Sequence, residues 1–245
     1  MKKRILTFVL FFALILSSNA YAHGAEPDFG DNPYPYPLTQ MQAVGYGSLA
    51  FAILTVIIFF FSSKMSEMTK KLVFSLLVLI VAFVTIYLAI TTVHTNISSA
   101  TKGPVHWHAD YEIWVCGKRL SLPEPHGMSN KQGTPLLHSH NDNRIHIEGA
   151  LMQERQASLG AFFQATGGYL SDDEIKFPTD EGLVEVHNGD LCNGQSAKLY
   201  VFVNGISIND SARHVVAPYG KVPPGDKVKF VFTEKSIENT NPDLG

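Results

Sequence analysis

Ten of the 245 residues are histidines, and five of these lie in two short stretches with regular spacing. The first stretch, Pro-Val-His-Trp-His-Ala-Asp, contains His106 and His108, and the second, His-Ser-His-Asn-Asp-Asn-Arg-Ile-His-Ile-Glu, contains His138, His140 and His146. Side chains two residues apart in a β-strand project from the same face, so each His-x-His pair brings two imidazoles together. Imidazole is the commonest metal ligand in proteins. We therefore predict a metal site formed by these five histidines.

The second stretch has the pattern of a β-hairpin that turns at Asn141-Asp142-Asn143. With a three-residue loop, the pairing of the two strands places His138, His140 and His146 on one face, together with Glu148. A loop with an even number of residues would instead turn His146 to the opposite face and break the cluster.

The ligand types favour copper, with zinc as the alternative. Several histidines with few carboxylates suit copper(II) or zinc, whereas calcium and magnesium prefer oxygen ligands. The lack of a four-cysteine set and a location outside the cytoplasm favour copper, and zinc held by three histidines with an open position is its nearest rival. Further candidates, either as ligands or as acceptors that orient the imidazoles, are Asp110, Asp142, Glu148 and His187, the last of which shares a strand face with Glu185.

The chain has two cysteines, Cys116 and Cys192. Both cysteines would lie outside the cytoplasm, on the oxidising side of the membrane. They can pair there if their α-carbons come within about 7 Å. A disulfide is the preferred interpretation, and a role for Cys192 as a copper ligand near the histidines is the alternative. Their spacing does not decide between the two.

Residues 1–22 have the features of a secretory signal peptide. Lys2, Lys3 and Arg4 precede a short apolar stretch, which ends in the small-residue pattern Ala20-Tyr21-Ala22. Cleavage after Ala22 would make His23 the mature N-terminus, and its amine and ring could together chelate copper. That arrangement resembles the histidine brace of copper monooxygenases and of some copper-binding proteins.

Two uncharged apolar stretches follow a Pro- and aromatic-rich linker at 23–40. Residues 41–62 and 72–93 are each about as long as the 20 residues that cross a bilayer core. Both are apolar on every face, as suits contact with lipid. They predict a two-helix transmembrane hairpin, with small residues around Gly47 that could admit a partner membrane protein.

The short loop at 63–71 sets the orientation of this hairpin. It carries Lys64, Lys70 and Lys71 against the single acidic residue Glu67, so the positive-inside rule places it in the cytoplasm. The chain is then expected in the cytoplasmic (inner) membrane, with the linker at 94–103 and everything after it on the extracytoplasmic side.

Residues 104–236 are predicted to form a His-rich β domain, and 237–245 a flexible tail. Short alternating segments broken by Gly, Pro, Asn and Asp indicate strands with one buried face, and Asn204-Gly205 is a strong hairpin signal. One helix is expected over Ser158 to Thr166, because Leu159, Phe162 and Phe163 have helical spacing. The expected fold class is α+β, mainly antiparallel and sandwich-like.

Four stretches of this domain resemble a loosely defined prokaryotic family of secreted or membrane-anchored proteins. Its members share a His-x-His-Ala start and a later His-x-His-Asx…Ile-His-Ile-Glu hairpin, and they are largely uncharacterised. The matching stretches are His106 to Gly117, His138 to Gly149, Ser158 to Phe163 and Leu199 to Gly205. The resemblance supports the boundary of the outer domain and implies no mechanism.

Composition excludes two broad classes of function. A net charge of −3 gives no electrostatic reason to bind nucleic acid, and the apolar stretches exclude a soluble cytoplasmic enzyme. The sequence predicts a membrane-anchored protein that binds copper, or else zinc, for metal acquisition, delivery or sensing, or as an accessory subunit of a membrane metalloenzyme.

Two alternatives remain open at the level of sequence. One is a metal-dependent enzyme, similar to a copper oxidase or oxygenase or to a zinc hydrolase, with Glu148 or Asp110 as base. The other is a metal-free adhesion or assembly module whose histidines are structural or respond to pH. The sequence shows no nucleophile elbow, phosphate loop or HExxH motif, which favours binding over catalysis.

Overall fold

The computed structural model describes residues 36–126, 130–216 and 225–236. The expected signal peptide, His23 and the tail at 237–245 lie outside these residues. The chain divides into two units. Of the described residues, 36–107 and 147–157 form the helical unit, and 108–146 and 158–236 belong to the sheet unit.

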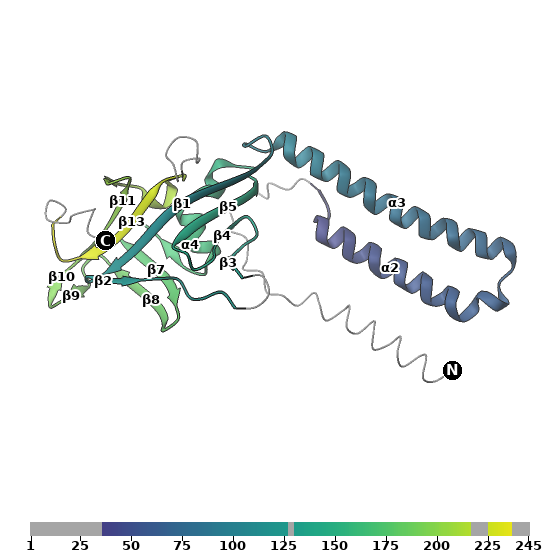
Figure 1. Ribbon diagram of the computed structural model, residues 1–245, viewed down its shortest axis with the longest axis horizontal. Coiled ribbons are helices and arrows are strands. Elements are labelled where there is room, and N and C mark those ends of the chain that lie inside the picture. Colours follow the sequence, from purple (N-terminus) through teal and green to yellow (C-terminus); the bar gives the residue numbers. More distant parts are fainter. Residues whose placement is uncertain (1–35, 127–129, 217–224, 237–245) are drawn as a thin grey trace. The chain divides into compact units, whose positions relative to one another are not determined.

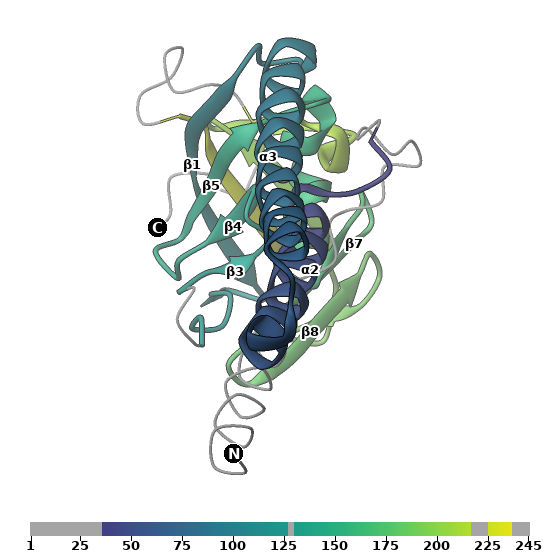
Figure 2. The same ribbon diagram turned by 90° about the vertical axis from the view of Figure 1, so that its right-hand side faces the viewer.

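Two apolar helices, α2 (Gln40–Phe61) and α3 (Glu67–Ser98), dominate the helical unit, and the short 3-10 helix η1 (Ser62–Lys64) joins them. Both are long and apolar enough to cross a membrane. They lie side by side in the two views of Figures 1 and 2. A Cβ atom at Gly47 would come within 2.5 Å of Val84 Cγ2, so glycine permits this close approach.

The second helix is longer at both ends than the stretch 72–93 expected from hydropathy. The side chain of Ser66 accepts a hydrogen bond from the Thr69 N–H and caps the helix, and Lys70 Nζ lies 2.7 Å from Glu67 Oε1 one turn away. These polar contacts start α3 at Glu67. They leave a shorter connection between the helices than the nine-residue stretch 63–71.

An eight-stranded sheet holds the histidine-rich segments. Its strand order is β12-β11-β13-β1-β5-β4-β3, with β2 paired to β1, and Figure 2 shows β1, β5, β4 and β3 following one another across it. Its strands are β1 (Pro104–Val115), β2 (Lys118–Leu120), β3 (Gln132–Gly133), β4 (Leu137–Ser139), β5 (Arg144–Ala150), β11 (Lys198–Val203), β12 (Ile206–Ile208) and β13 (Lys227–Thr233).

The register of β13 makes this sheet mixed. It runs parallel to β1, with Asp110 opposite Lys227, and antiparallel to β11, with Val201 opposite Phe230. The predicted α+β class with a mostly antiparallel sheet is confirmed, and the parallel pair β1–β13 is an addition to it. The sandwich-like arrangement stays a prediction.

Two small sheets complete the sheet unit. One is formed by β6 (Tyr169–Leu170), β7 (Glu174–Thr179) and β8 (Gly182–His187), and the other by β9 (Leu191–Cys192) and β10 (Gln195–Ser196). Besides η1, the described residues form two further 3-10 helices. They are η2 (Glu154–Ala157), in the helical unit, and η3 (Ser211–Arg213), in the sheet unit.

The core of the sheet unit forms around α4 (Leu159–Ala165), the helix expected from the spacing of Phe162 and Phe163. The Phe162 ring lies 5.3 Å from that of Tyr111 on β1. The Phe163 ring lies 5.0 Å from Phe230 on β13 and 6.4 Å from Phe177 on β7. All five rings are buried, so α4 joins the large sheet to the small one through aromatic packing.

The carboxylate of Asp172 closes a loop beside this core and makes the stability of the sheet unit depend on pH. It accepts hydrogen bonds from the backbone N–H groups of Ser211 and Asp210, at 2.9 and 3.0 Å. These bonds, that of Ser211 first, hold the pKa of Asp172 below its ordinary value of 3.8. The stability it contributes is therefore present above that value and is lost as the pH falls through the lowered pKa.

We expect Asp172→Ala to cost about 1 kcal/mol at pH 7 and almost nothing at a pH below the lowered pKa of Asp172, where the wild-type carboxylate is also protonated. Thermal unfolding at both pH values, followed by circular dichroism, measures the difference. The matched control is Asp173→Ala, which removes a neighbouring carboxylate that bonds the hydroxyl of Ser171 instead of backbone N–H groups. An equal loss at both pH values would contradict the prediction.

Candidate metal site

Four imidazole rings meet on one face of the large sheet, within the sheet unit. His108 comes from β1, His138 from β4 and His146 from β5, and His140 follows directly after β4. On β5, Ile145 and Ile147 are fully buried on the core side, so alternation turns His146 to the other face. His146 is nevertheless only 9% exposed, because the other rings cover it.

The rings are in direct contact. The centroid of His146 lies 4.6 Å from that of His108, 4.7 Å from that of His140 and 5.5 Å from that of His138. His138 and His140 are 4.8 Å apart. We call these four residues the histidine cluster.

The spacing of the nitrogen atoms is close to that of a metal site. His138, His140 and His146 each offer a ring nitrogen that lies within 4.8 Å of the other two. Metal–nitrogen bonds of about 2.0 to 2.1 Å place cis-related donors about 3 to 3.5 Å apart. The three nitrogens are therefore close enough together to be candidate ligands of one ion.

Two of the rings are oriented by hydrogen bonds from their other nitrogen. His146 Nε2 lies 2.9 Å from Asp142 Oδ2, so Nε2 carries the proton and Nδ1 presents a lone pair. His140 Nδ1 donates to the carbonyl oxygen of Asn130, which leaves the lone pair on Nε2. Such outer partners are typical of metal-binding histidines, because they fix the tautomer and the direction of the ring.

The carboxylate of Asp142 is kept ionised in this arrangement. Burial alone would raise its pKa, but the hydrogen bond and the charge of His146, with the backbone N–H groups of Asp142 and Arg144, bring that pKa below its ordinary value. An ionised carboxylate is the partner that strengthens imidazole as a ligand. Asp142 therefore has the predicted role of acceptor, and it acts on His146.

The other histidine of the first stretch, His106, lies in the helical unit together with Glu148. His106 Nε2 is 3.3 Å from Glu148 Oε1, so the predicted acceptor Glu148 faces His106. Asp110 instead accepts a 2.7 Å hydrogen bond from Arg144 Nε. The role of Asp110 as a ligand or as an acceptor for an imidazole stays a prediction.

One register explains three contacts between β1 and β5. The contacts join His106 to Glu148, His108 to His146, and Asp110 to Arg144. The residue numbers of each pair have the same sum, which is the signature of one antiparallel register. The matching patterns His-x-His-x-Asp and Arg-x-His-x-Glu were a signal for this pairing in the sequence.

His187 belongs to a separate group on the β7–β8 hairpin. Its Nε2 lies 3.6 Å from Glu174 Oε1 and 3.8 Å from Glu185 Oε1. Lys176 Nζ is 2.5 Å from Glu185 Oε2, so a lysine already neutralises this exposed group. We therefore do not assign His187 to the histidine cluster.

Cys116 and Cys192 form a disulfide, with their α-carbons 5.3 Å apart. Since these are the two cysteines of the chain, no thiolate is left to bind a metal. The alternative of Cys192 as a copper ligand is overturned by this pairing.

The structure also pairs His214, for which the sequence pattern suggests no partner. Its Nε2 lies 3.3 Å from Asp226 Oδ2, and the other oxygen of Asp226 accepts a hydrogen bond from Asn204. The partners come from separate segments, and the sequence spacing holds no periodic signal for such a contact. This is the arrangement of a structural histidine beside a buried carboxylate.

Comparison with known proteins identifies no relative. No family model, curated protein or solved structure matches this chain. The resemblance of the His-x-His segments to a family of secreted proteins therefore adds nothing to the assignment of the site.

Proposed function

We propose that this protein is a membrane-anchored, extracytoplasmic protein that binds one transition-metal ion, copper in preference to zinc, in the histidine cluster. The observation that carries the proposal is the contact of four imidazoles from three strands and one loop, two of them oriented by Asp142 and Asn130. Imidazoles gathered in this way are costly to bury unless they bind something in common.

Copper is favoured by the set of donors. The histidine cluster consists of neutral nitrogen ligands, and the disulfide removes sulfur from the set. Nitrogen ligands suit copper(II), which also binds a given site of this type more tightly than zinc does. Zinc bound by three of the imidazoles remains the second candidate.

A membrane anchor and an outward location follow from separate features. The two apolar helices can cross a bilayer, and three lysines stand near their connection, which the positive-inside rule assigns to the cytoplasm. The disulfide independently supports an oxidising compartment for the sheet unit. These features support an anchor in the inner membrane, with the sheet unit outside the cytoplasm and lipid in contact with the helices.

Binding, delivery or sensing of the metal is better supported than catalysis. A catalytic metal needs an open position that faces a pocket. His138 is fully buried and His146 nearly so, which leaves little room for a substrate beside these two rings. A role in acquiring or passing on the metal, or as an accessory subunit of a metalloenzyme, follows from this enclosure.

The full chain in detergent micelles, first freed of metal, tests the proposal. We expect it to retain one copper per chain after equilibration with micromolar copper(II) and gel filtration, as measured by mass spectrometry of the metal. The electron paramagnetic resonance spectrum should show coupling to several imidazole nitrogens. Absence of bound metal, or a spectrum of oxygen ligands alone, would refute the proposal, and retention of zinc against equimolar copper would overturn the choice of metal.

A further inference from the structure

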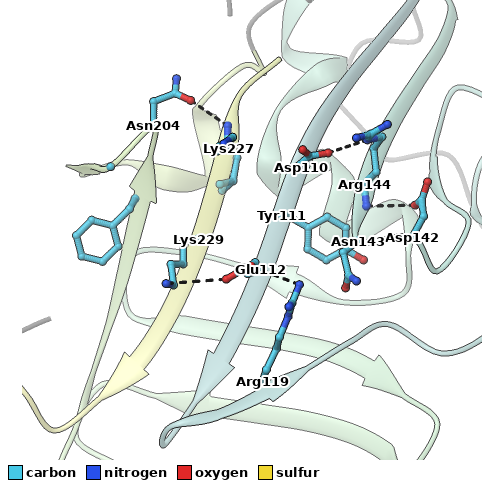
Figure 3. A pocket seen from close by; sticks show the side chains of 13 residues that line it. Asp110, Tyr111, Glu112, Arg119, Asp142, Asn143, Arg144, Asn204, Lys227 and Lys229 are labelled. Carbon is cyan, nitrogen blue, oxygen red and sulfur yellow. Dashed lines mark hydrogen bonds and ion pairs between the residues drawn. The ribbon is translucent and has the colours of Figure 1, made fainter. Parts of the chain in front are cut away.

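A second site is suggested by a polar groove on the face of the large sheet that is turned away from α4. The groove has a volume of about 750 Å³ and is lined by residues of β11, β13, β1, β2 and β5 (Figure 3). Asp110 and Glu112 of β1 line it with outward-facing side chains, and Tyr111 between them borders it although its side chain is buried. The groove is therefore formed by the outward-facing positions of the strands.

Charged side chains cross the floor of this groove in two rows (Figure 3). In the first row, Lys227 stands opposite Asp110 in the strand register, and Asp110 accepts the 2.7 Å hydrogen bond from Arg144 Nε. In the second row, Glu112 lies between Lys229 and Arg119, with N···O distances of 3.9 and 3.4 Å. Each row thus has two cations around one carboxylate.

The excess of positive charge in the groove is accessible to a ligand. Among the described residues, Lys227 Nζ has no ion-pair partner, and the terminal amino groups of Arg144 form no hydrogen bond. Glu112 is already held by Trp114 Nε1 at 2.9 Å in addition to its two cations. The one further acid, Asp142, is engaged by His146. A guanidinium offers five donors and binds carboxylates in pairs of hydrogen bonds, so the rows retain unused capacity for anions.

The distance between the rows selects the kind of anion. Lys227 and Lys229 are two residues apart on one strand, which separates the rows by about 6.7 Å. A single small anion such as acetate reaches one row only. A short carbon chain with a carboxylate at each end reaches both. Phe202, opposite Lys229 in the register, gives one wall an apolar surface for that chain.

We propose that the groove binds a small organic acid that carries two or more carboxylates. One carboxylate would bind Arg144 and Lys227, and another Arg119 and Lys229. The four cationic side chains of this site are not those of the histidine cluster, whereas Asp142, which also lines the groove, contacts the cluster at His146.

Calorimetric titration of the metal-free full chain with citrate tests this site. The metal must be removed with a nitrogen-donor chelator, since a carboxylate chelator would itself compete for the groove. At matched ionic strength we expect citrate to bind at least about tenfold more tightly than acetate or inorganic phosphate. Lys227→Gln and Arg119→Gln should each weaken citrate binding about tenfold, because each removes a charged hydrogen-bond donor.

Two controls separate the groove from general charge effects and from the metal site. Lys198→Gln removes the same charge from β11 at a position that does not line the groove, and it should leave citrate binding unchanged. The single variant His140→Ala, which keeps the buried His138, should bind citrate like the metal-free wild type. Citrate binding no tighter than that of acetate or phosphate, or unaffected by Lys227→Gln and Arg119→Gln, would overturn the proposal.

Discussion

Replacing His138 and His140 together by alanine is expected to lower the affinity for copper by about 100-fold or more. The change removes two of the four rings of the histidine cluster, whose centroids lie 4.8 Å apart. Loss of an outer hydrogen-bond partner alone costs about 10- to 100-fold in metal affinity, and loss of two ligands costs at least the upper end of that range. Competition of the full chain against a chromophoric copper chelator measures the affinity.

The matched control is His126→Ala/His187→Ala, which also removes two imidazoles but leaves the histidine cluster intact. Its affinity for copper should equal that of the wild type. His138 is fully buried, so its replacement could disturb the fold. The single variant His140→Ala changes a half-exposed side chain and should keep the wild-type melting temperature. A lower copper affinity of this variant then reports on metal binding and not on unfolding. Wild-type affinity in both cluster variants would show that copper binds elsewhere.

The histidine-bearing segments were predictable where strand periodicity and turn chemistry act locally. Asn141 and Asn143 adopt positive φ angles of 64° and 55°, as asparagine does readily, and the turn between β4 and β5 follows. The His-x-His spacing then orients His138 and His140 toward His146. Such patterns depend on residues close in sequence, and a single sequence contains them.

Contacts between distant segments were not predictable in the same way. The partner of Asp110 is Arg144, and the choice between a histidine and an arginine as partner depends on the β1–β5 register. A hydrophobic pattern sets which face a strand buries, but it leaves several pairings of distant strands open. Asp142, four residues from His146, contacts that histidine, whereas Asp110 contacts Arg144.

The fold shows the same division between local and distant information. The capped helix α4 and the hairpin at Asn204-Gly205 follow from local signals. The parallel pairing of β13 with β1 joins residues more than 100 positions apart, and local patterns do not encode it. Strand β7 contains Pro178, a residue that is uncommon within strands. Proline is tolerated near the end of the strand, where its missing N–H removes little of the hydrogen bonding between the strands.

Breaking the disulfide is expected to destabilise the sheet unit by about 4 kcal/mol. Cys116 and Cys192 are 76 positions apart, and a cross-link that closes a loop of this length removes about that much chain entropy from the unfolded state. Cys192 also lies on the two-residue strand β9, whose short hairpin has little packing of its own to hold it to the large sheet. For a unit of this size the loss corresponds to about 15 °C in the melting temperature.

Thermal unfolding of Cys116→Ser/Cys192→Ser in detergent micelles measures this loss. The single variants and the reduced wild type should melt at the same temperature as the double variant, because each lacks the same bond. A purely structural disulfide leaves one copper per chain below the melting temperature, so the copper stoichiometry of the folded variant should equal that of the wild type. Melting within about 3 °C of the wild type would contradict the entropic argument, since the unfolded state would then gain little freedom when the bond is removed.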